Sequence, residues 1–254
     1  MKEMHKFYID GEWVNSLGSE TIEVINPSDE SIIGSIAAGT KEDIDVAVAA
    51  AKEAFKSFGF SSKEERIALL ENIIMEYEKR SEELAQTISE EMGAPLWLSN
   101  VAQVTSGLSH FKDTLGVLKS FEFETTENEY IVRKEPIGVI GMITPWNWPM
   151  NQITTKVSAA LAAGCTMVLK PSEISPYCAM LLAEVFDTAG VPAGIFNLVN
   201  GYGPTVGAAL SEHKDVDMMS FTGSTRAGIA VAQASATTVK RVHQELGGKS
   251  SNII

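Results

Sequence analysis

The sequence predicts an α/β fold: a doubly wound parallel sheet with flanking helices and one protruding β-hairpin. Short, almost purely apolar runs such as Ile137–Ile143 are typical of parallel strands that helices cover on both faces. Segments of helical length separate such runs throughout residues 137–245, which is the pattern of successive βαβ units. The acidic, alternating stretch Phe121–Lys134 departs from this pattern and predicts the hairpin. Together these observations indicate a Rossmann-like architecture.

The clearest βαβ unit runs from Gly138 to Glu173. The corner at residues 144–149 must leave the sheet, because its two prolines lack the N–H that a strand ladder needs. An Ala-rich helix, Met150–Ala163, follows and ends at Gly164, a residue type favoured just after a helix. The next strand, Thr166–Lys170, is expected to return to the same edge of the sheet.

The remaining elements extend this pattern in both directions. Beyond Lys170 we expect a helix Pro176–Ala189, a strand Ile195–Val199, a short helix Thr205–Ser211, a strand Met218–Phe221, a helix Ser224–Ala234 and a strand Val239–Glu245. Near the N-terminus, residues 7–36 alternate apolar and polar positions around turn signals and predict short antiparallel strands. Four amphipathic helices are then expected, beginning near Thr40, Ser62, Leu84 and Pro95 and ending by Leu118.

Composition excludes several classes of function. The net charge of −13 repels polyanions, so nucleic acid is not an expected partner. The N-terminal segment does not resemble a signal peptide, and no apolar run is long enough to span a membrane. Two cysteines make neither a disulfide framework nor a metal site. We therefore expect a cytoplasmic protein without a membrane partner or a metal.

Polar residues are expected at the carboxyl ends of the strands, where ligands bind in open α/β sheets. Asn147 follows the first strand, and its amide can donate a hydrogen bond to a developing oxyanion. Lys170 ends the next strand, and Ser172 and Glu173 follow it, so a cation, a hydroxyl and a carboxylate there can reach a ribose. A surface ion pair is the alternative for Lys170 and Glu173.

Two further stretches are candidates for ligand binding. In Phe221–Gly228 a strand ends in Gly and a helix begins at a hydroxyl residue, an arrangement that suits a phosphate. It is neither a Walker A loop nor a GxGxxG motif, so a plain strand–helix junction is the alternative. Residues 201–205 are a weaker candidate, with a turn as the alternative. Glu245 precedes two glycines that leave backbone room for a substrate or cofactor to approach, and a structural or solvated carboxylate is the alternative.

Four motifs resemble those of the NAD(P)-dependent aldehyde dehydrogenase superfamily in order and spacing. They are PWNWP at residues 145–149, AAGCTMVLKPSE at 162–173, FTGSTRAG at 221–228 and ELGGKS at 245–250. The stretches Tyr8–Val14 and Ile22–Ile36 resemble the N-terminal segment of the same family, so the resemblance covers the whole chain.

The resemblance implies NAD as the cofactor. Lys170 and Glu173 match residues that hold the adenine ribose, and a carboxylate there disfavours the 2′-phosphate of NADP. NADP stays possible as an alternative cofactor. The cofactor-binding positions that the resemblance implies are Ile143, Thr144, Pro145, Trp146, Lys170, Ser172, Glu173, Gly203, Pro204, Phe221, Thr222, Gly223, Ser224, Gly228, Leu246 and Gly247.

The resemblance also implies the reaction, in which a small aldehyde is oxidised to a carboxylic acid through a thioester on a cysteine. Asn147 matches the residue that stabilises the oxyanion. Glu245 matches the general base, a task that a partly buried carboxylate with a raised pKa would suit. The family's catalytic cysteine lies a few dozen residues beyond ELGGKS, whereas Cys165 and Cys178 are expected to be core thiols. We therefore expect the cofactor-binding half of an enzyme, ending before the nucleophile and inactive alone.

The domain organisation follows from the same comparison. Residues 1–118 and 137–254 are expected to form an NAD-binding domain, incomplete at its C-terminal end, without the catalytic domain. Residues 119–136 match a hairpin that joins subunits into a dimer or tetramer, although a solvated edge hairpin is an equal alternative.

Other functions stay open at this point. The chain can be a catalytically inactive NAD-binding or regulatory module, or another member of the superfamily such as a semialdehyde or acyl-phosphate-forming dehydrogenase. A nonenzymatic structural protein is disfavoured, because residues such as Asn147, Lys170 and Glu245 serve no packing need. Trp148 and Met150 hint at an apolar aldehyde.

Overall fold

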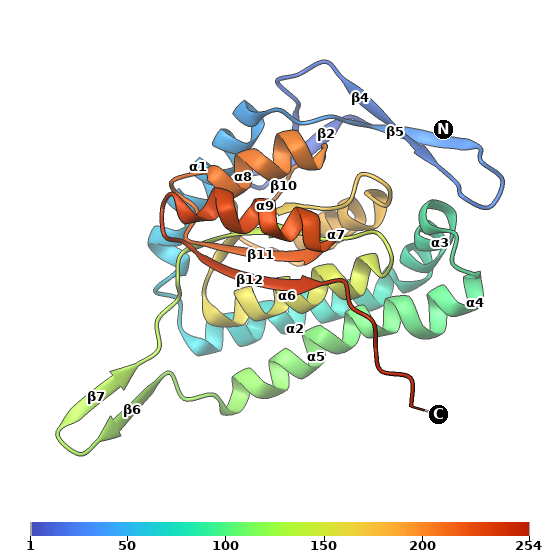
Figure 1. The fold of residues 1–254 in the computed structure, drawn as a ribbon. Helices are drawn as coiled ribbons and strands as arrows, with labels where there is room; N and C mark the ends of the chain where they lie inside the picture. Colours follow the sequence, from blue (N-terminus) through green and yellow to red (C-terminus); the bar gives the residue numbers. More distant parts are fainter. Residues whose placement is uncertain (1, 254) are drawn as a thin grey trace.

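A mixed sheet with helices on both faces forms the centre of the protein (Figure 1). The computed structural model describes residues 2–253, and within them seven strands form this sheet in the order β12-β11-β8-β9-β10-β2-β3. The strands are β2 (Lys6–Ile9), β3 (Glu12–Asn15), β8 (Val139–Ile143), β9 (Thr166–Lys170), β10 (Phe196–Leu198), β11 (Met218–Gly223) and β12 (Arg241–Leu246). The α/β fold class predicted from the sequence is confirmed.

The five strands from β12 to β10 run parallel, and β8 lies between β9 and β11. Every residue of β8 and β9 is buried, because both faces of these strands are covered. Successive side chains point to opposite faces. Ile140 and Met142 therefore belong to one hydrophobic cluster, and Val139 and Ile143 belong to the other.

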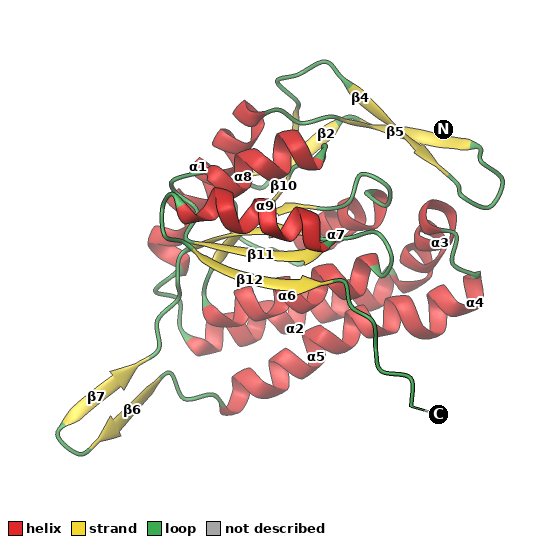
Figure 2. Ribbon diagram, in the orientation of Figure 1, coloured by secondary structure: helices red, strands yellow, loops and turns green. Residues whose placement is uncertain are grey.

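Helices form a layer on each side of the sheet (Figure 2). On one side, α6 (Pro149–Ala163) and α7 (Tyr177–Thr188) pack on the strands, and α2 (Lys63–Lys79) and α5 (Thr105–Ser120) pack against α6. The other layer consists of α1 (Lys41–Phe58), α8 (Ala208–Glu212), which follows the π-helical turn η2 (Gly203–Gly207), and α9 (Thr225–Ala236). Helix α3 (Ser81–Met92) contacts α7 at one end of the molecule.

The N-terminal region shows what the sequence did not predict. Antiparallel strands were expected, and β4 (Thr21–Ile25) does pair in that way with β5 (Ile32–Ala37). However, β1 (Lys2–Met4) pairs parallel with β5, and β2 joins the main sheet antiparallel to β10. The single helix expected from Pro95 to Leu118 is instead α4 (Leu96–Leu98), the π-helical segment η1 (Ser99–Val104) and α5 in succession.

The predicted hairpin is present and projects from the body of the molecule (Figure 1). Its strands β6 (Glu124–Glu127) and β7 (Tyr130–Arg133) pair antiparallel and form a sheet of their own. All four residues of β7 are exposed. Among residues 2–253, no helix is both long enough and apolar enough to cross a membrane.

Asp43 connects the start of α1 to the segment after β3. Its buried carboxylate accepts hydrogen bonds from the backbone N–H of Leu17 (2.9 Å), the hydroxyl of Ser16 (3.0 Å) and the backbone N–H of Thr40 (2.8 Å). Thr40 in turn accepts a bond from the N–H of Asp43, so the pair forms a capping box. The side chain therefore fixes both the first turn of α1 and the chain that leads away from the sheet.

Asp43→Ala is expected to lower the free energy of unfolding by about 2–4 kcal/mol, because several polar groups lose a buried charged acceptor together. Urea denaturation measures the change. Glu42→Ala is the control, since it removes an exposed carboxylate from the same turn and hence from the same end of the helix dipole. Equal losses in the two variants would contradict the role of Asp43.

Candidate functional site

The strand order creates a switch point between β8 and β11. From β8 the chain adds β9 and then β10 on one side, and it returns to add β11 and β12 on the other side. Ligands bind in such a crevice, outside the carboxyl ends of the strands. The register places Ile143 opposite both Lys170 and Phe221, so predicted site residues from three separate strands form one row at this edge.

The turn after β8 holds Asn147 in an accessible position. The sheet ends where Thr144 donates its N–H to the carbonyl oxygen of Lys170 at 3.3 Å. Asn147 is exposed, and its backbone oxygen accepts a hydrogen bond of 3.4 Å from Nε2 of Gln103. Pro149 then starts α6. Among residues 2–253 the Asn147 amide has no hydrogen-bond partner, so it can donate to a ligand, while Gln103 of η1 holds the backbone oxygen.

Lys170 and Glu173 form a partly buried ion pair rather than a surface pair. The Lys170 side chain is only 4% exposed, and its Nζ lies 2.7 Å from Oε2 of Glu173. Burial lowers the pKa of Lys170, and the negative charge of Glu173 opposes that shift. Ser172 is buried, and its hydroxyl accepts a hydrogen bond from the N–H of Ile174 at 3.3 Å. A ribose hydroxyl can meet both members of the ion pair here.

The junction between β11 and α9 has the geometry expected of a phosphate site. Ser224 caps α9, since its hydroxyl accepts a hydrogen bond from the N–H of Ala227. At Gly223 a Cβ would lie 2.6 Å from the ring of Phe221, so glycine is required there. Gly228 has a different role: a Cβ there would lie 2.5 Å from Leu246, which shows that it allows α9 to pack closely on β12.

Buried hydroxyl groups also mark this edge. Oγ1 of Thr144 and Oγ1 of Thr222 are both buried, and neither has a hydrogen-bond partner among residues 2–253. Buried polar groups are normally paired, so these two are suited to a polar ligand such as a dinucleotide. Gly203 and Gly247 have open space where a Cβ would stand. Pro204, Pro145 and Trp146 are partly or fully exposed beside their strand ends. The residues present therefore fit a dinucleotide.

In this structure Glu245 lacks the partial burial that would suit a general base. Its side chain is 68% exposed and lies 3.5 Å from Nε2 of His243. The physical reason is that β12 is the outermost strand and that Glu245 pairs only with Thr222, on one side. Met150 also differs from expectation, because it is buried in the core, whereas Trp148 is 36% exposed.

Lys156 is a candidate functional residue that the sequence did not single out. A cavity of about 680 Å³ lies beside β8, β11, β12 and α6, and its lining includes Lys156, Ser220 and Glu245. Nζ of Lys156 donates to the hydroxyl of Ser220 at 3.1 Å. Burial lowers the pKa of Lys156 to about 8, and Glu245 partly opposes the shift. Lys156 is the single cation of an Ala-rich, buried helix, and this feature of the sequence could have identified it.

Cys165 and Cys178 are both buried, as expected of core thiols, and burial raises the pKa of each. Neither thiol lines the carboxyl edge of the sheet. A nucleophilic cysteine at this site would therefore have to be a different residue.

Comparison with known proteins settles the family. The sequence matches the aldehyde dehydrogenase family over residues 13–254. The chain belongs to the aldehyde dehydrogenase family. It is 54% identical to 3-succinoylsemialdehyde-pyridine dehydrogenase from Pseudomonas sp, a match that covers 100% of this chain and 54% of that protein.

Solved aldehyde dehydrogenases share the fold closely. The enzyme from Bartonella henselae superimposes with a TM-score of 0.97 at 48% identity, covering 99% of this chain and 54% of that one. A mutant enzyme from Pseudomonas syringae, in complex with NAD+ and octanal, gives a TM-score of 0.97 at 50% identity, covering 98% and 51%. The chain thus spans about half the length of the aldehyde dehydrogenases that it matches.

Lys156→Met is expected to be more stable than the unchanged chain at pH 7, because it removes a buried charge. Raising the pH should narrow this gap in the free energy of unfolding between the variant and the unchanged chain. Lys156 loses its proton near pH 8 in the folded chain but near its usual pKa of 10.5 in the unfolded chain. The destabilisation caused by its buried charge therefore declines as the pH rises between these two pKa values. Urea denaturation at pH 7 and pH 9.5 measures the gap. Lys41→Met, at an exposed position, controls for the lost charge. A gap that stays constant with pH would contradict the burial of a charged Lys156.

Proposed function

We propose that this chain is the NAD-binding part of an aldehyde dehydrogenase that oxidises an aldehyde to a carboxylic acid. One observation carries the proposal: the partly buried Lys170–Glu173 ion pair lies at the switch-point edge of the sheet, where Lys170 stands in one row with Ile143 and Phe221. Two relatives of known structure contain NAD+. When bound, NAD+ supplies the acceptor for a hydride.

The adenine ribose is proposed to bind the ion pair. Lys170 is pre-oriented by burial and by Glu173, so a ribose hydroxyl finds a donor and an acceptor whose positions are already fixed. The carboxylate disfavours a phosphate on the ribose, which is why we propose NAD rather than NADP. The pyrophosphate is proposed to meet the N-terminus of α9, where Ser224 leaves backbone N–H groups available.

Two side chains are proposed to act on the substrate. The amide of Asn147 would donate a hydrogen bond to the carbonyl oxygen as negative charge develops on it. Glu245 would take a proton from the water that releases the acid. In an enzyme of the relatives' full length, the surface around Glu245 would have to become less accessible to water for this role. The nucleophile is proposed to be a cysteine other than Cys165 and Cys178.

A semialdehyde is the second candidate for the substrate. The observation that favours it is the 54% identity, over the whole chain, to a dehydrogenase named for a pyridine semialdehyde. The relative solved with octanal supports an unsubstituted aliphatic aldehyde instead. The exposed ring of Trp148 suits either class. We further propose a cytoplasmic location, which the two free cysteines support.

The hairpin is proposed to join subunits. An isolated two-stranded sheet is only marginally stable in water, so its side chains gain from a partner surface. Tyr130 and Ile131 are 57% and 61% exposed and lie on one strand, β7. A second copy of the chain, pairing or packing along β7, would cover these side chains. We accordingly propose a homo-oligomer, and we assign residues 1–118 and 137–254 to the NAD-binding domain.

Glu173→Gln is expected to weaken NADH binding about tenfold, because the ribose loses a charged acceptor. The same change should narrow the preference over NADPH, since repulsion of the 2′-phosphate is removed. Titration of NADH and NADPH, followed by nucleotide fluorescence, measures both effects. Glu53→Gln is the matched control, because it breaks an exposed Lys–Glu pair of the same spacing, with Lys56. Unchanged NADH and NADPH affinities in Glu173→Gln would refute the ribose assignment.

Asn147→Ala, made in an enzyme of the relatives' full length that includes this sequence, should lower kcat on the order of 10²–10³-fold. NADH affinity and the thermal unfolding temperature should stay the same, because the Asn147 side chain is exposed and makes no hydrogen bond among residues 2–253. Steady-state kinetics with an aliphatic aldehyde provide the measurement. Normal turnover would show that another group stabilises the oxyanion.

A further inference from the structure

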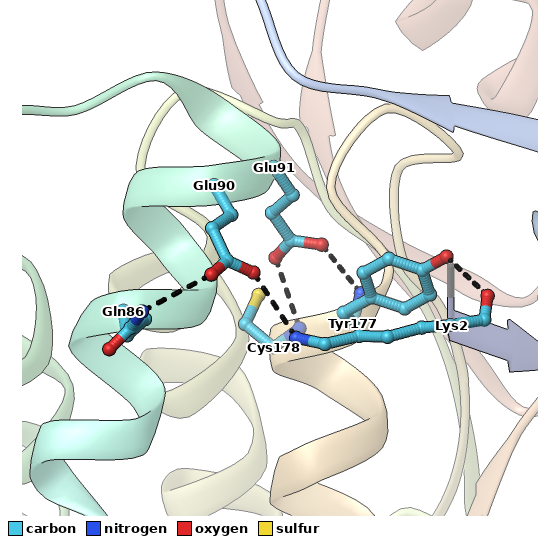
Figure 3. Close-up of polar contacts among 6 residues, drawn as sticks. All are labelled: Lys2, Gln86, Glu90, Glu91, Tyr177 and Cys178. Carbon is cyan, nitrogen blue, oxygen red and sulfur yellow. Dashed lines mark hydrogen bonds and ion pairs between the residues drawn. The ribbon is translucent and has the colours of Figure 1, made fainter. Parts of the chain in front are cut away.

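Glu91 is a fully buried carboxylate at the last turn of α3, far along the sequence from every candidate site residue. Figure 3 shows it pointing away from its own helix and toward the start of α7. Oε2 accepts a hydrogen bond from the N–H of Tyr177 at 2.6 Å, and Oε1 accepts one from the N–H of Cys178 at 3.0 Å. The two oxygens thus bind the first two N–H groups of α7.

Helix α7 has no cap of its own. Pro176 occupies the N-cap position, and it offers no side-chain acceptor. The first N–H groups of a helix have no partner within the helix, and burial makes them costly if they stay unpaired. The dipole of α7 favours a negative charge at the N-terminus of that helix. The dipole of α3 disfavours one at its own C-terminus, where Glu91 lies. Glu91 therefore supplies from another helix the cap that the local sequence lacks.

The capped turn continues directly into the candidate cofactor site. Only residues 171–176 separate β9, which ends at Lys170, from the first residue of α7. This loop carries Ser172 and Glu173. Its one end is fixed by the strand ladder and its other end by Glu91, so the position of Glu173 relative to Lys170 depends on both.

We propose that Glu91 is a positioning residue for the cofactor site: by holding the start of α7, it fixes the loop that places Glu173 beside Lys170. This inference rests on the proposed role of the ion pair in NAD binding. Glu91 itself touches neither member of the pair. Its effect reaches Glu173 through the backbone of residues 174–176, and this effect is lost when the carboxylate no longer accepts both N–H bonds.

The ionisation of Glu91 gives this role a measurable signature. Burial raises its pKa to about 7, and the donors of Cys178 and Tyr177 and the charge of Lys2 oppose the shift. The charged or titratable groups around it are Lys2 on β1, Glu90 on α3, and Tyr177 and Cys178 on α7, whereas η1 and β5 carry no charged residue. A protonated carboxyl group keeps only one good acceptor, so the cap weakens as the pH falls through about 7.

Stability and cofactor affinity should respond to pH in opposite directions. The pKa of Glu91 in the folded chain is raised above its usual value of 4.5. Its contribution to stability is therefore greatest below pH 4.5 and is lost as the pH rises through about 7. The cap, in contrast, strengthens over the same rise. A purely structural Glu91 would therefore lower stability at high pH and leave NADH affinity unchanged, whereas a positioning Glu91 raises NADH affinity over the same range.

The first test is hydrogen–deuterium exchange on the 254-residue chain with Glu91→Gln. The amide replaces one acceptor by a donor, so the backbone N–H groups of residues 172–175, 177 and 178 should exchange about tenfold faster or more. Glu90→Gln is the matched control, because it removes a carboxylate from the adjacent position of the same helix. That carboxylate pairs at the surface with Lys2 (3.3 Å). Unchanged exchange at residues 172–178 in Glu91→Gln would overturn the proposal.

The second test is the affinity for NADH between pH 6 and pH 8. Affinity of the unchanged chain should rise over this range, that of Glu90→Gln should rise equally, and that of Glu91→Gln should be about tenfold weaker and flat. Glu91→Asp, which keeps the charge, should restore part of the affinity and the slope, and it decides the matter if Glu91→Gln does not fold. A parallel slope in Glu91→Gln would overturn the proposal. If the unchanged chain binds no NADH, the proposed function fails, and the exchange experiment alone decides whether Glu91 holds the loop.

Discussion

The parallel pairing of β8 with β9 on one side and β11 on the other is the constraint on which the rest of the structure depends. Burial of β8 and β9 on both faces requires a helical layer on each side, and the crossovers between the strands supply these layers. The same pairing brings the carboxyl ends of the strands to one edge. Segments that follow Ile143, Lys170 and Gly223 therefore meet there, although about eighty residues separate the first from the last.

Most of the fold could be predicted because its signals are local. The apolar run of β8, the Ala-rich helix α6 and the left-handed Gly164 at its end all specify their structure within a few residues. The pairing of β2 with β10 and of β1 with β5 could not be predicted, since a short alternating strand carries no information about its neighbour in the sheet. The π-helical segment before α5 leaves no periodicity signal that distinguishes it from α-helix.

The candidate site, like the fold, could be predicted only where the signals are local. The rule that ligands bind at the carboxyl ends of parallel strands, together with the family resemblance, predicted Asn147, Lys170 and Glu173, because each lies at or just after the end of a recognisable strand. The exposure of Glu245 could not be predicted, since burial of an outermost strand depends on what packs against it rather than on its own residues. Lys156 and Glu91 escaped notice for a related reason: each is defined by partners more than sixty residues away, Ser220 and Tyr177.

Buried ionisable side chains that bind backbone groups of distant elements are what connect the scaffold to its exposed segments. Arg66 donates to the carbonyl oxygen of Ala162 at the end of α6, and its guanidinium lies 4.6 Å from the ring centroid of Phe123 at the base of the hairpin. Asp43 and Glu91 do the same for the starts of α1 and α7. Each side chain satisfies orphaned backbone groups whose burial is otherwise costly, so each is favourable only when two elements hold their correct relative position. Interactions of this kind specify geometry more than they add stability, and they account for how exposed functional loops keep a fixed position on this fold.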